Sequence, residues 1–234
     1  PENLGFGLAN NAGLALADTP YVLFLNPDAT LSPGCLDALL AVAERRPEAA
    51  LLVPTILKAN GERFEKWSSP VCDPVFRADG SDDAARPIAF ASGAVVLARR
   101  EAISAVGGFD PAIFLYFEDD DLSRRALDRG WRILHVPAAM ARHVGNVSSP
   151  ATERMTEVKH WHLAWSERHV RKKHGLPVFS RWRIGETLVK LGWARLMGNR
   201  HEAAKQSGLL RGTRAALRGV AAQDVRDRIG EGVS

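Results

Sequence analysis

The stretch TPYVLFLNPDATLSPGCLDALLAVAERRP, residues 19–47, contains the strand, turn and helix pattern that decides the fold. Residues 21–25 are a short, continuous apolar run, which is typical of a strand buried on both faces. The Asn-Pro-Asp sequence at 26–28 breaks that run with turn chemistry. Ser32 is placed to cap a helix that starts with a proline and continues to about Arg46. This order predicts one strand–helix unit of a layered domain.

The alternation of strand and helix continues further along the chain. Apolar runs predict strands at residues 51–53, 94–98 and 131–137, and local patterns predict helices at residues 100–106 and 121–129. Glycines follow both helices, and glycine is the usual residue at a helix end. Residues 58–87 are polar and are expected to form a long loop or a weak hairpin. The predicted fold class is therefore α/β.

The composition is that of an ordinary globular protein. The chain has 234 residues, of which 46% are hydrophobic and 25% are charged. This length suits one large domain or one domain with an appendage. Cys35 and Cys72 lack metal-type spacing, so a reducing setting is expected rather than a disulfide framework. No apolar run reaches the length of about eighteen residues that a spanning helix needs.

The net charge of +4 hides an asymmetry between the two parts of the chain. Residues 1–150 carry 14 basic and 19 acidic residues, whereas residues 151–234 carry 17 basic and 8 acidic residues. Beyond residue 150 the strand patterns disappear, and Lys, Arg, His and Trp become frequent. The sequence therefore predicts a domain over residues 1–150 and a basic, amphipathic helical tail over residues 151–234.

The tail contains one clearly amphipathic segment, residues 182–196. Its broad apolar side consists of Ile184, Leu188, Val189, Leu191, Trp193 and Leu196. One interpretation is peripheral contact with a membrane, because basic residues attract anionic headgroups and an apolar helix face can enter the interface. The other is a helical pair that packs on the domain and leaves a solvated basic side.

Asp28 is the first candidate for chemistry, since it follows the end of the strand predicted at 21–25. In open α/β sheets, ligands bind in the crevice at the carboxyl ends of strands. One or two carboxylates there, completed by substrate phosphates, are a typical site for Mg²⁺ or Mn²⁺. The alternative is a structural Asx turn that ends the strand.

The second candidate is the acidic run EDDD at residues 118–121, which follows the apolar residues 114–117. Carboxylates in a first helical turn are favoured by the helix dipole, and Asp121 is spaced to pair with Arg125. That structural account leaves the first two acids unexplained. A half-buried carboxylate among like charges has a raised pKa, which suits a general base near neutral pH.

His143 and Gly93 are weaker candidates. His143 follows the last predicted strand and is either a structural histidine or a metal ligand. Gly93 precedes a predicted strand, where a glycine can simply mark close backbone packing.

Five segments occur in a recognisable order: NLGFGLANNAGLALA (3–17), YVLFLNPDA (21–29), FASGAVVLARREAISAVGGFD (90–110), FLYFEDDDLSRRALDRGWRILHVP (114–137) and ARHVGNVSS (141–149). Together they resemble the family 2 inverting glycosyltransferases of GT-A fold, particularly the rhamnosyltransferase-like branch of bacterial cell-surface polysaccharide synthesis. The resemblance covers about residues 1–150. It implies a GT-A-type mixed, mostly parallel sheet flanked by helices, and a hexosyltransferase-type activity.

The resemblance implies a metal site in the turn after the first strand. Asn26-Pro27-Asp28 stands where the family has its Asp-x-Asp motif, so Asp28 would hold Mg²⁺ or Mn²⁺ on the donor diphosphate. Asn26 departs from that motif, because it offers a carbonyl oxygen but no charge. His143 matches the histidine that often completes the metal site.

The same resemblance implies roles in catalysis and donor binding. Glu118 and Asp119 match the family's Glu-Asp pair, in which Asp119 is the base; the preceding aromatics would pack the site wall and the acids would face the cleft. Arg125 matches an arginine that pairs with Asp121 or with the diphosphate. The remaining donor positions of the family are Gly93, in the sugar pocket, and Asn11, near the nucleotide.

The implied partners are a dTDP- or UDP-linked sugar donor and a glycan or polyprenyl-linked acceptor, whose hydroxyl receives the sugar with inversion. A cytoplasmic location is expected, with the tail peripheral on the inner face of the plasma membrane. Nucleic acid is not an expected partner, because the basic residues are confined to the tail and no nucleic-acid motif is present.

The family has a strand–helix–strand unit before the position of Asn3, and this sequence lacks it. We therefore hypothesise a fragment of a longer transferase, with an incomplete nucleotide pocket and an exposed sheet edge. These residues alone are then either an active transferase or an inactive fragment of one. Two other function classes stay open. One is a non-catalytic GT-A-like scaffold, which Asn26 would suit, and the other is a sugar-nucleotide nucleotidyltransferase, which can share the GT-A sheet.

Overall fold

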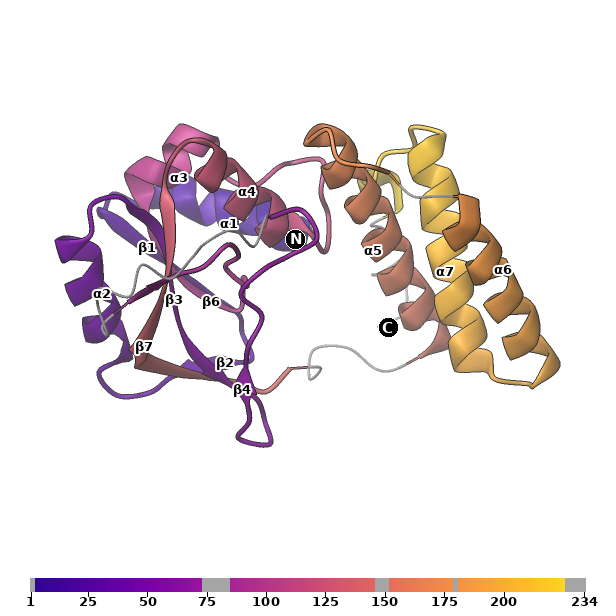
Figure 1. The fold of residues 1–234 in the computed structure, drawn as a ribbon, viewed down its shortest axis with the longest axis horizontal. Coiled ribbons are helices and arrows are strands. Elements are labelled where there is room, and N and C mark those ends of the chain that lie inside the picture. The colour runs from indigo at the N-terminus through magenta and orange to yellow at the C-terminus, as the bar shows by residue number, and fades with distance from the viewer. Residues whose placement is uncertain (1–2, 73–84, 146–151, 179–180, 226–234) are drawn as a thin grey trace. The chain divides into compact units, whose positions relative to one another are not determined.

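The computed structural model describes residues 3–72, 85–145, 152–178 and 181–225, and Figure 1 shows its fold. The chain forms two compact units. The described residues of Asn10–Phe109 and Asp119–Ser148 form the sheet unit. The described residues of Pro1–Ala9, Asp110–Glu118 and Ser149–Ser234 form the helical unit. The helical unit thus includes two short segments from the first 150 residues. The predicted boundary between a domain and a tail at residue 150 stays a prediction.

The elements follow one another in the order that the sequence alternation suggests, with several additions. They are α1 (Gly5–Leu16), β1 (Tyr21–Leu25), β2 (Ala29–Leu31), α2 (Cys35–Arg45), β3 (Ala49–Leu57), β4 (Arg63–Phe64), β5 (Arg86–Pro87), β6 (Val95–Arg99), α3 (Arg100–Val106), α4 (Glu118–Asp128), β7 (Arg132–His143), α5 (Glu153–Lys173), α6 (Arg181–Leu196) and α7 (Arg200–Leu217). β1 and α3 have the predicted bounds. The helix α1 and the strand β2 were not predicted.

The helix after β1 starts later than its sequence pattern suggests. Ser32 was the predicted cap, but α2 begins at Cys35, and the residue before it is Gly34 with a left-handed φ of 75°. Residues 29–31 pair with β7 as the short strand β2, so the chain is still extended where the helix was expected to begin. Glycine enters this left-handed conformation without the steric penalty of a side chain.

The sheet has the strand order β1-β6-β3-β7-β2, with β4 beside β3 and β5 beside β7. The predicted mixed sheet flanked by helices is confirmed, but the prediction that it is mostly parallel was wrong. Among the described residues, β3 and β7 are parallel and every other pairing is antiparallel. Strand β6 runs antiparallel to both of its neighbours, β1 and β3, and the short strand β4 turns back on β3 as a hairpin.

The core of the sheet unit lies along β3, whose residues are buried from Ala49 to Ile56. Helix α2 packs against the sheet through Leu39 and Val42, which join Leu52 and Leu134 in one apolar cluster. Leu39 and Leu134 are completely buried. This packing holds the strands at the register from which the site is built.

The helical unit contains α5, α6 and α7, which lie beside one another (Figure 1). The helices α5 and α7 approach closely because two glycines of α7, Gly208 and Gly212, face the backbone of α5. A Cβ atom at these positions would collide with the carbonyl oxygens of Glu157 and Trp161. Among the described residues, no helix is both long and apolar enough to cross a membrane.

We expect Gly212→Ala to destabilise the helical unit by about 1–3 kcal/mol, because the added methyl group must push the two helices apart. The measurement is the free energy of unfolding from urea denaturation followed by circular dichroism. Gly192→Ala is the matched control, since an added Cβ at this helical glycine meets no atom. The control should be neutral or stabilise by up to about 1 kcal/mol. Equal effects of the two substitutions would contradict the close approach of α5 and α7.

Candidate active site

The turn after β1 and the turn before β6 meet at one end of the sheet. Leu25, the last residue of β1, pairs with Val95, the first residue of β6, because the two strands are antiparallel. Just beyond this pair, the N–H of Asn26 donates to the carbonyl oxygen of Ala94 at 3.0 Å. The Asn-Pro-Asp turn therefore lies next to the segment that contains Gly93.

The pairing of β2 with β7 brings His143 to the same turn. Its register places His143 opposite Ala29, and its Nε2 atom lies 3.0 Å from Oδ1 of Asp28. The Nδ2 atom of Asn26 lies 3.4 Å from the same Nε2. Both side chains of the Asp28–His143 pair stay partly exposed, at 15% and 28%. The two predicted metal ligands are thus adjacent and accessible.

This pair fits a divalent cation that is held jointly by protein and substrate. Among the described residues, no group of three His, Cys, Asp or Glu side chains forms a complete protein-only metal site. Mg²⁺ is commonly held by one or two carboxylates and completed by phosphate oxygens. An imidazole beside the carboxylate is better suited to Mn²⁺ than to Mg²⁺, because hard oxygen ligands are what Mg²⁺ prefers.

Asp119 is positioned by two backbone donors. Its Oδ2 atom accepts the N–H of Gly93 at 3.1 Å, and its Oδ1 atom accepts the N–H of Asp120 at 3.0 Å. The first contact explains why Gly93 belongs to the site: its backbone binds the carboxylate. Asp119 is half-buried, whereas the other three acids of the run are buried. Of these four acids, Asp119 is therefore the one that a substrate can reach.

The environment of the acidic run is only partly as predicted. Phe114 is buried in the helical unit, in a cluster with Trp161 and Trp165, and the expectation that the aromatics pack the site wall stays a prediction. The acids were expected to face a cleft together, but three of them are buried within α4, which starts at Glu118 rather than at 121. Tyr116 has a left-handed φ of 66°, as does the next residue, a backbone strain that no sequence pattern indicated.

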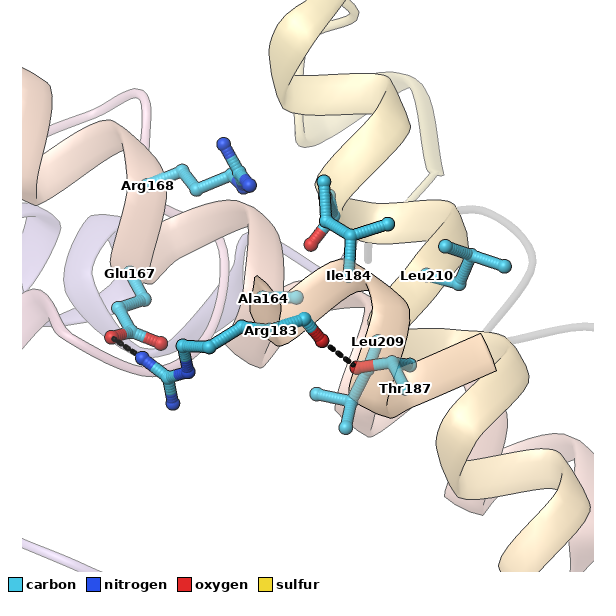
Figure 2. A pocket seen from close by; sticks show the side chains of 9 residues that line it. Ala164, Glu167, Arg168, Arg183, Ile184, Thr187, Leu209 and Leu210 are labelled. Atoms are coloured by element: carbon cyan, nitrogen blue, oxygen red, sulfur yellow. Dashed lines mark hydrogen bonds and ion pairs between the residues drawn. The ribbon is translucent and has the colours of Figure 1, made fainter. Parts of the chain in front are cut away.

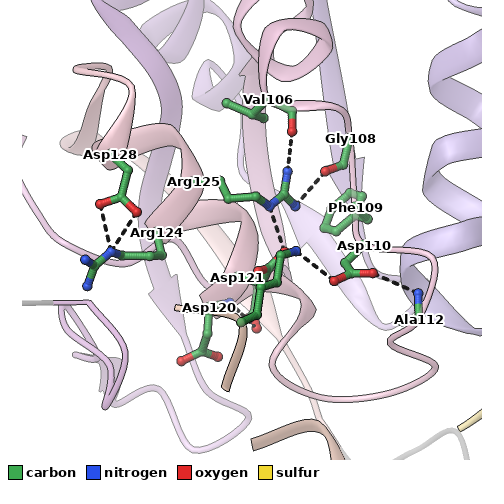
Figure 3. A network of polar contacts seen from close by, with 12 residues as sticks. Val106, Gly108, Phe109, Asp110, Ala112, Asp120, Asp121, Arg124, Arg125 and Asp128 are labelled. Carbon is green, nitrogen blue, oxygen red and sulfur yellow. Dashed lines mark hydrogen bonds and ion pairs between the residues drawn. The ribbon is translucent and has the colours of Figure 1, made fainter. Parts of the chain in front are cut away.

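Arg125 pairs with Asp121, which is one of the two roles suggested for it. Its Nε donates to the completely buried Asp121 carboxylate at 2.8 Å. Its two terminal nitrogens donate to the carbonyl oxygens of Val106 and Gly108, at 2.6 and 2.7 Å (Figure 3). Arg125 therefore joins α4 to the turn after α3, which compensates the burial of its charge.

Asp120 is a feature of the site that sequence reasoning did not single out. Its side chain is 4% exposed, and Oδ1 has no hydrogen-bond partner among the described residues. Burial, and then the negative charge of Asp119, raise the pKa of Asp120 to about 7, while Lys66 and Ser69 act in the opposite direction. Asp120 can thus carry a proton near neutral pH. The sequence signal that could have indicated its burial is its position on the inner side of an amphipathic helix.

The side-chain amide of Asn11 forms two hydrogen bonds with the backbone of the turn after α3. Its Nδ2 donates to the carbonyl oxygen of Phe109, and its Oδ1 accepts the N–H of Phe109, both at 2.8 Å. Gly108 has a left-handed φ of 68°, and a Cβ there would press against Oδ1 of Asn11. A contact of Asn11 with a nucleotide stays a prediction, and its observed role is to hold this turn.

The order of these elements agrees with a known protein family. A profile of the family described as glycosyl transferase family group 2 matches residues 21–196, which is most of the chain. The chain belongs to glycosyl transferase family group 2. The matched span includes the Asp28–His143 pair and the acids of α4.

The relatives of this family 2 chain include bacterial rhamnosyltransferases. It is 30% identical over 200 residues to the N-acetylglucosaminyl-diphospho-decaprenol L-rhamnosyltransferase of Mycobacterium tuberculosis (strain ATCC 25618 / H37Rv), covering 71% of this chain and 65% of the relative. It is 26% identical over 205 residues to rhamnosyltransferase WbbL of Escherichia coli (strain K12), covering 72% and 71%. The chain thus spans slightly less than two thirds of the length of its mycobacterial relative.

A solved structure supports the fold. The crystal structure of GalNAc-T7 with UDP, GalNAc and Mn²⁺ aligns with 96% of this chain and 44% of that protein, with a TM-score of 0.50 and 13% sequence identity. At this identity the likeness concerns the fold alone. It agrees with the predicted GT-A type.

A small pocket in the helical unit is a separate feature from the carboxylate site. It lies among α5, α6 and α7, and Figure 2 shows its lining side chains. Arg183 forms an ion pair with Glu167 at 3.7 Å on its wall, and Thr187 donates to the carbonyl oxygen of Arg183. Its volume of about 80 Å³ is well below that of typical ligand sites, so we do not assign it to the sugar donor.

Proposed function

We propose that this chain carries the catalytic site of an inverting glycosyltransferase of bacterial polysaccharide synthesis. In this reaction a sugar moves from a nucleoside diphosphate to a hydroxyl of a glycan or lipid-linked acceptor. The observation that carries the proposal is the state of Asp119, which is half-buried and held by the N–H groups of Gly93 and Asp120. Family membership and the rhamnosyltransferase relatives support the same reaction class.

Asp119 is the proposed general base. It would accept the proton of the acceptor hydroxyl while that oxygen attacks the anomeric carbon from the side opposite the leaving diphosphate. The attack forms the new glycosidic bond and inverts the sugar. Glycosidases need a second carboxyl group to protonate their leaving oxygen, but a diphosphate leaves as an anion. One accessible carboxylate is therefore sufficient for this chemistry, although four acids are adjacent in the sequence.

Asp28 and His143 are the residues that would hold a divalent cation. When bound, the cation neutralises negative charge that develops on the departing nucleoside diphosphate. Asn26 places an uncharged amide 3.4 Å from His143, where the family motif has a second carboxylate. We infer that the cation is held less tightly here than by two carboxylates, and more by the substrate phosphates.

The neighbouring residues would act as positioning groups. The pKa of Asp120 is raised to about 7, so near neutral pH Asp120 is protonated in a large part of the molecules and then places no second negative charge beside Asp119. Arg125 and Asn11 join α4 and α1 to the turn after α3 and so keep the start of α4 in place. Glu118 is buried, so we propose a structural contribution to the start of α4 rather than contact with substrate.

The donor that we propose is dTDP-rhamnose, with a UDP-sugar as the alternative. The names of two relatives, which are both rhamnosyltransferases, support the rhamnosyl group, and the dTDP carrier rests on the family resemblance. The acceptor that we propose is lipid-linked, since the mycobacterial relative is named for a diphospho-decaprenol substrate.

The test of the donor site is calorimetric titration of dTDP and UDP in the presence and absence of Mn²⁺. We expect binding that requires Mn²⁺ and that weakens by at least about tenfold in Asp28→Ala, because a direct ligand is lost. Asp37→Ala is the matched control, since Asp37 is an exposed aspartate on α2 outside the site. Cation-independent binding, or equal binding by the two variants, would contradict the assignment of Asp28. No binding by a chain that melts cooperatively would contradict a working donor site in these residues.

A further inference from the structure

Helix α6 has an exposed apolar side. We call the following set the α6 face: Trp182 (75% exposed), Val189 (73%), Trp193 (63%), Leu196 (77%) and, just after the helix, Met197 (63%). The four members within α6 are separated by seven, four and three residues, which is about one or two helical turns, so they form one stripe, and Met197 follows Leu196 directly. The opposite side of α6 contains the buried residues Leu191 and Ala194 and packs in the helical unit. Helix α6 therefore has two apolar sides. One is buried and stabilises the fold, and the other, the α6 face, is exposed.

The composition of the α6 face is unusual for a surface that contacts only water. Single exposed apolar residues are common, but a contiguous stripe of large side chains marks an interaction site. Two of its members, Trp182 and Trp193, are tryptophans. An indole has an apolar body and a polar N–H, and tryptophan is accordingly enriched where a membrane meets water.

Basic residues border the α6 face. At 100° per residue, Lys190 and Arg195 lie on the two edges between the exposed and buried sides of the helix. Glu186, the single acid of α6, is paired with Lys190 at 2.6 Å, so these two charges largely cancel and Arg195 supplies the net positive charge at the edge of the stripe. Residues 152–225 as a whole contain 15 basic and 6 acidic residues. These residues therefore carry a large net positive charge.

We propose that the α6 face docks this chain on the surface of an anionic lipid bilayer, with α6 lying in the plane of the interface. The apolar stripe would enter the boundary between headgroups and acyl chains, and the basic residues at its edges would contact lipid phosphates. A second copy of the chain is the less favourable occupant, because two such positive units repel each other. α6 does not meet the length and hydropathy that spanning requires. This docking does not depend on the proposed glycosyl transfer.

The experiment is flotation of the full 234-residue chain with vesicles of phosphatidylcholine alone or with phosphatidylglycerol added at a ratio of about 3:1. We expect flotation with the anionic vesicles, much less with the neutral ones, and release at about 1 M salt. The double variant Trp182→Ser/Trp193→Ser should lower the partition coefficient by about tenfold or more. Replacement of Arg195 by Gln should lower it by about fivefold.

The matched control is Leu16→Ser, which removes an apolar side chain of 88% exposure from α1. The control should float like the unmodified chain, and all variants should keep the same melting temperature because the replaced side chains are exposed. Absence of flotation at low salt would overturn the proposal, as would flotation unaffected by the double substitution. Sedimentation of the chain as a dimer that the double variant dissociates, without vesicle binding, would identify a self-association face instead and also overturn it.

Discussion

Asp119→Asn is expected to lower kcat of sugar transfer by about a thousandfold, the size of effect that loss of a general base produces. The amide has almost the same shape, and its single carbonyl oxygen can still accept a backbone N–H. It cannot, however, accept the proton of the acceptor hydroxyl. The measurement is steady-state transfer from a nucleotide sugar, together with calorimetry of Mn²⁺-dependent nucleotide binding. Nucleotide binding should be unchanged, because the substitution is outside the proposed cation site.

Asp128→Asn is the control for this substitution. Asp128 is an exposed acid on the same helix, paired with Arg124 at 2.8 Å, and its change should alter kcat by less than about twofold. A similar loss in both variants would mean that α4 is sensitive to any change of charge. A loss of less than about tenfold for Asp119→Asn would contradict its role as the base.

Asp120→Asn is expected to stabilise the chain at pH 8 and to have little effect near pH 4. The folded state raises the pKa of Asp120 to about 7, so between about pH 4 and 7 the folded chain binds a proton that the unfolded chain has released. The stability contributed by this group is therefore complete at low pH and is lost as the pH rises toward 7. Over this range the loss is on the order of a few kcal/mol, at about 1.4 kcal/mol per pH unit.

The measurement is urea denaturation of the wild type and of Asp120→Asn at several pH values between 4 and 8. The difference between the two free energies of unfolding should grow with pH, because asparagine stays neutral throughout. Using the difference removes the contributions of other titrating groups, such as Asp110, whose pKa is lowered by its hydrogen bonds to His169 and Lys173. Asp37→Asn, at an exposed position, should give a nearly constant difference. Parallel curves for Asp120→Asn would contradict the buried, protonated state of Asp120.

Features that depend on neighbouring residues were predictable from the sequence. The apolar run at 21–25 is β1, and the helix at 100–106 is α3, because local patterns of apolar residues and glycine stops decide such short elements. The ion pair of Asp121 and Arg125 was predictable for the same reason, since residues four apart on a helix are neighbours. The site candidates were also visible as residue types, because carboxylates after a strand and at a helix start are local signals.

Tertiary structure decided which of these candidates meet and which of them water can reach. Asp28 and His143 are 115 residues apart, and only the register of β2 on β7 brings them to 3.0 Å. The backbone of Gly93 reaches Asp119 because antiparallel pairing of β6 with β1 presents its turn at that end of the sheet. The direction and register of strands depend on side chains from many segments, so a local pattern does not specify them.

The sequence alone therefore determined the alternating elements, the two carboxylate candidates (Asp28 and the acidic run at 118–121) and the basic, amphipathic tail. The antiparallel pairings, the burial of three acids around one accessible Asp119, and the raised pKa of Asp120 came from the folded chain. So did the contact of two α7 glycines with α5 and the division of α6 into a buried and an exposed apolar side. The physical reason is the same in each case: burial and hydrogen bonding depend on which distant segments pack together, and that choice is made by the free energy of the whole fold.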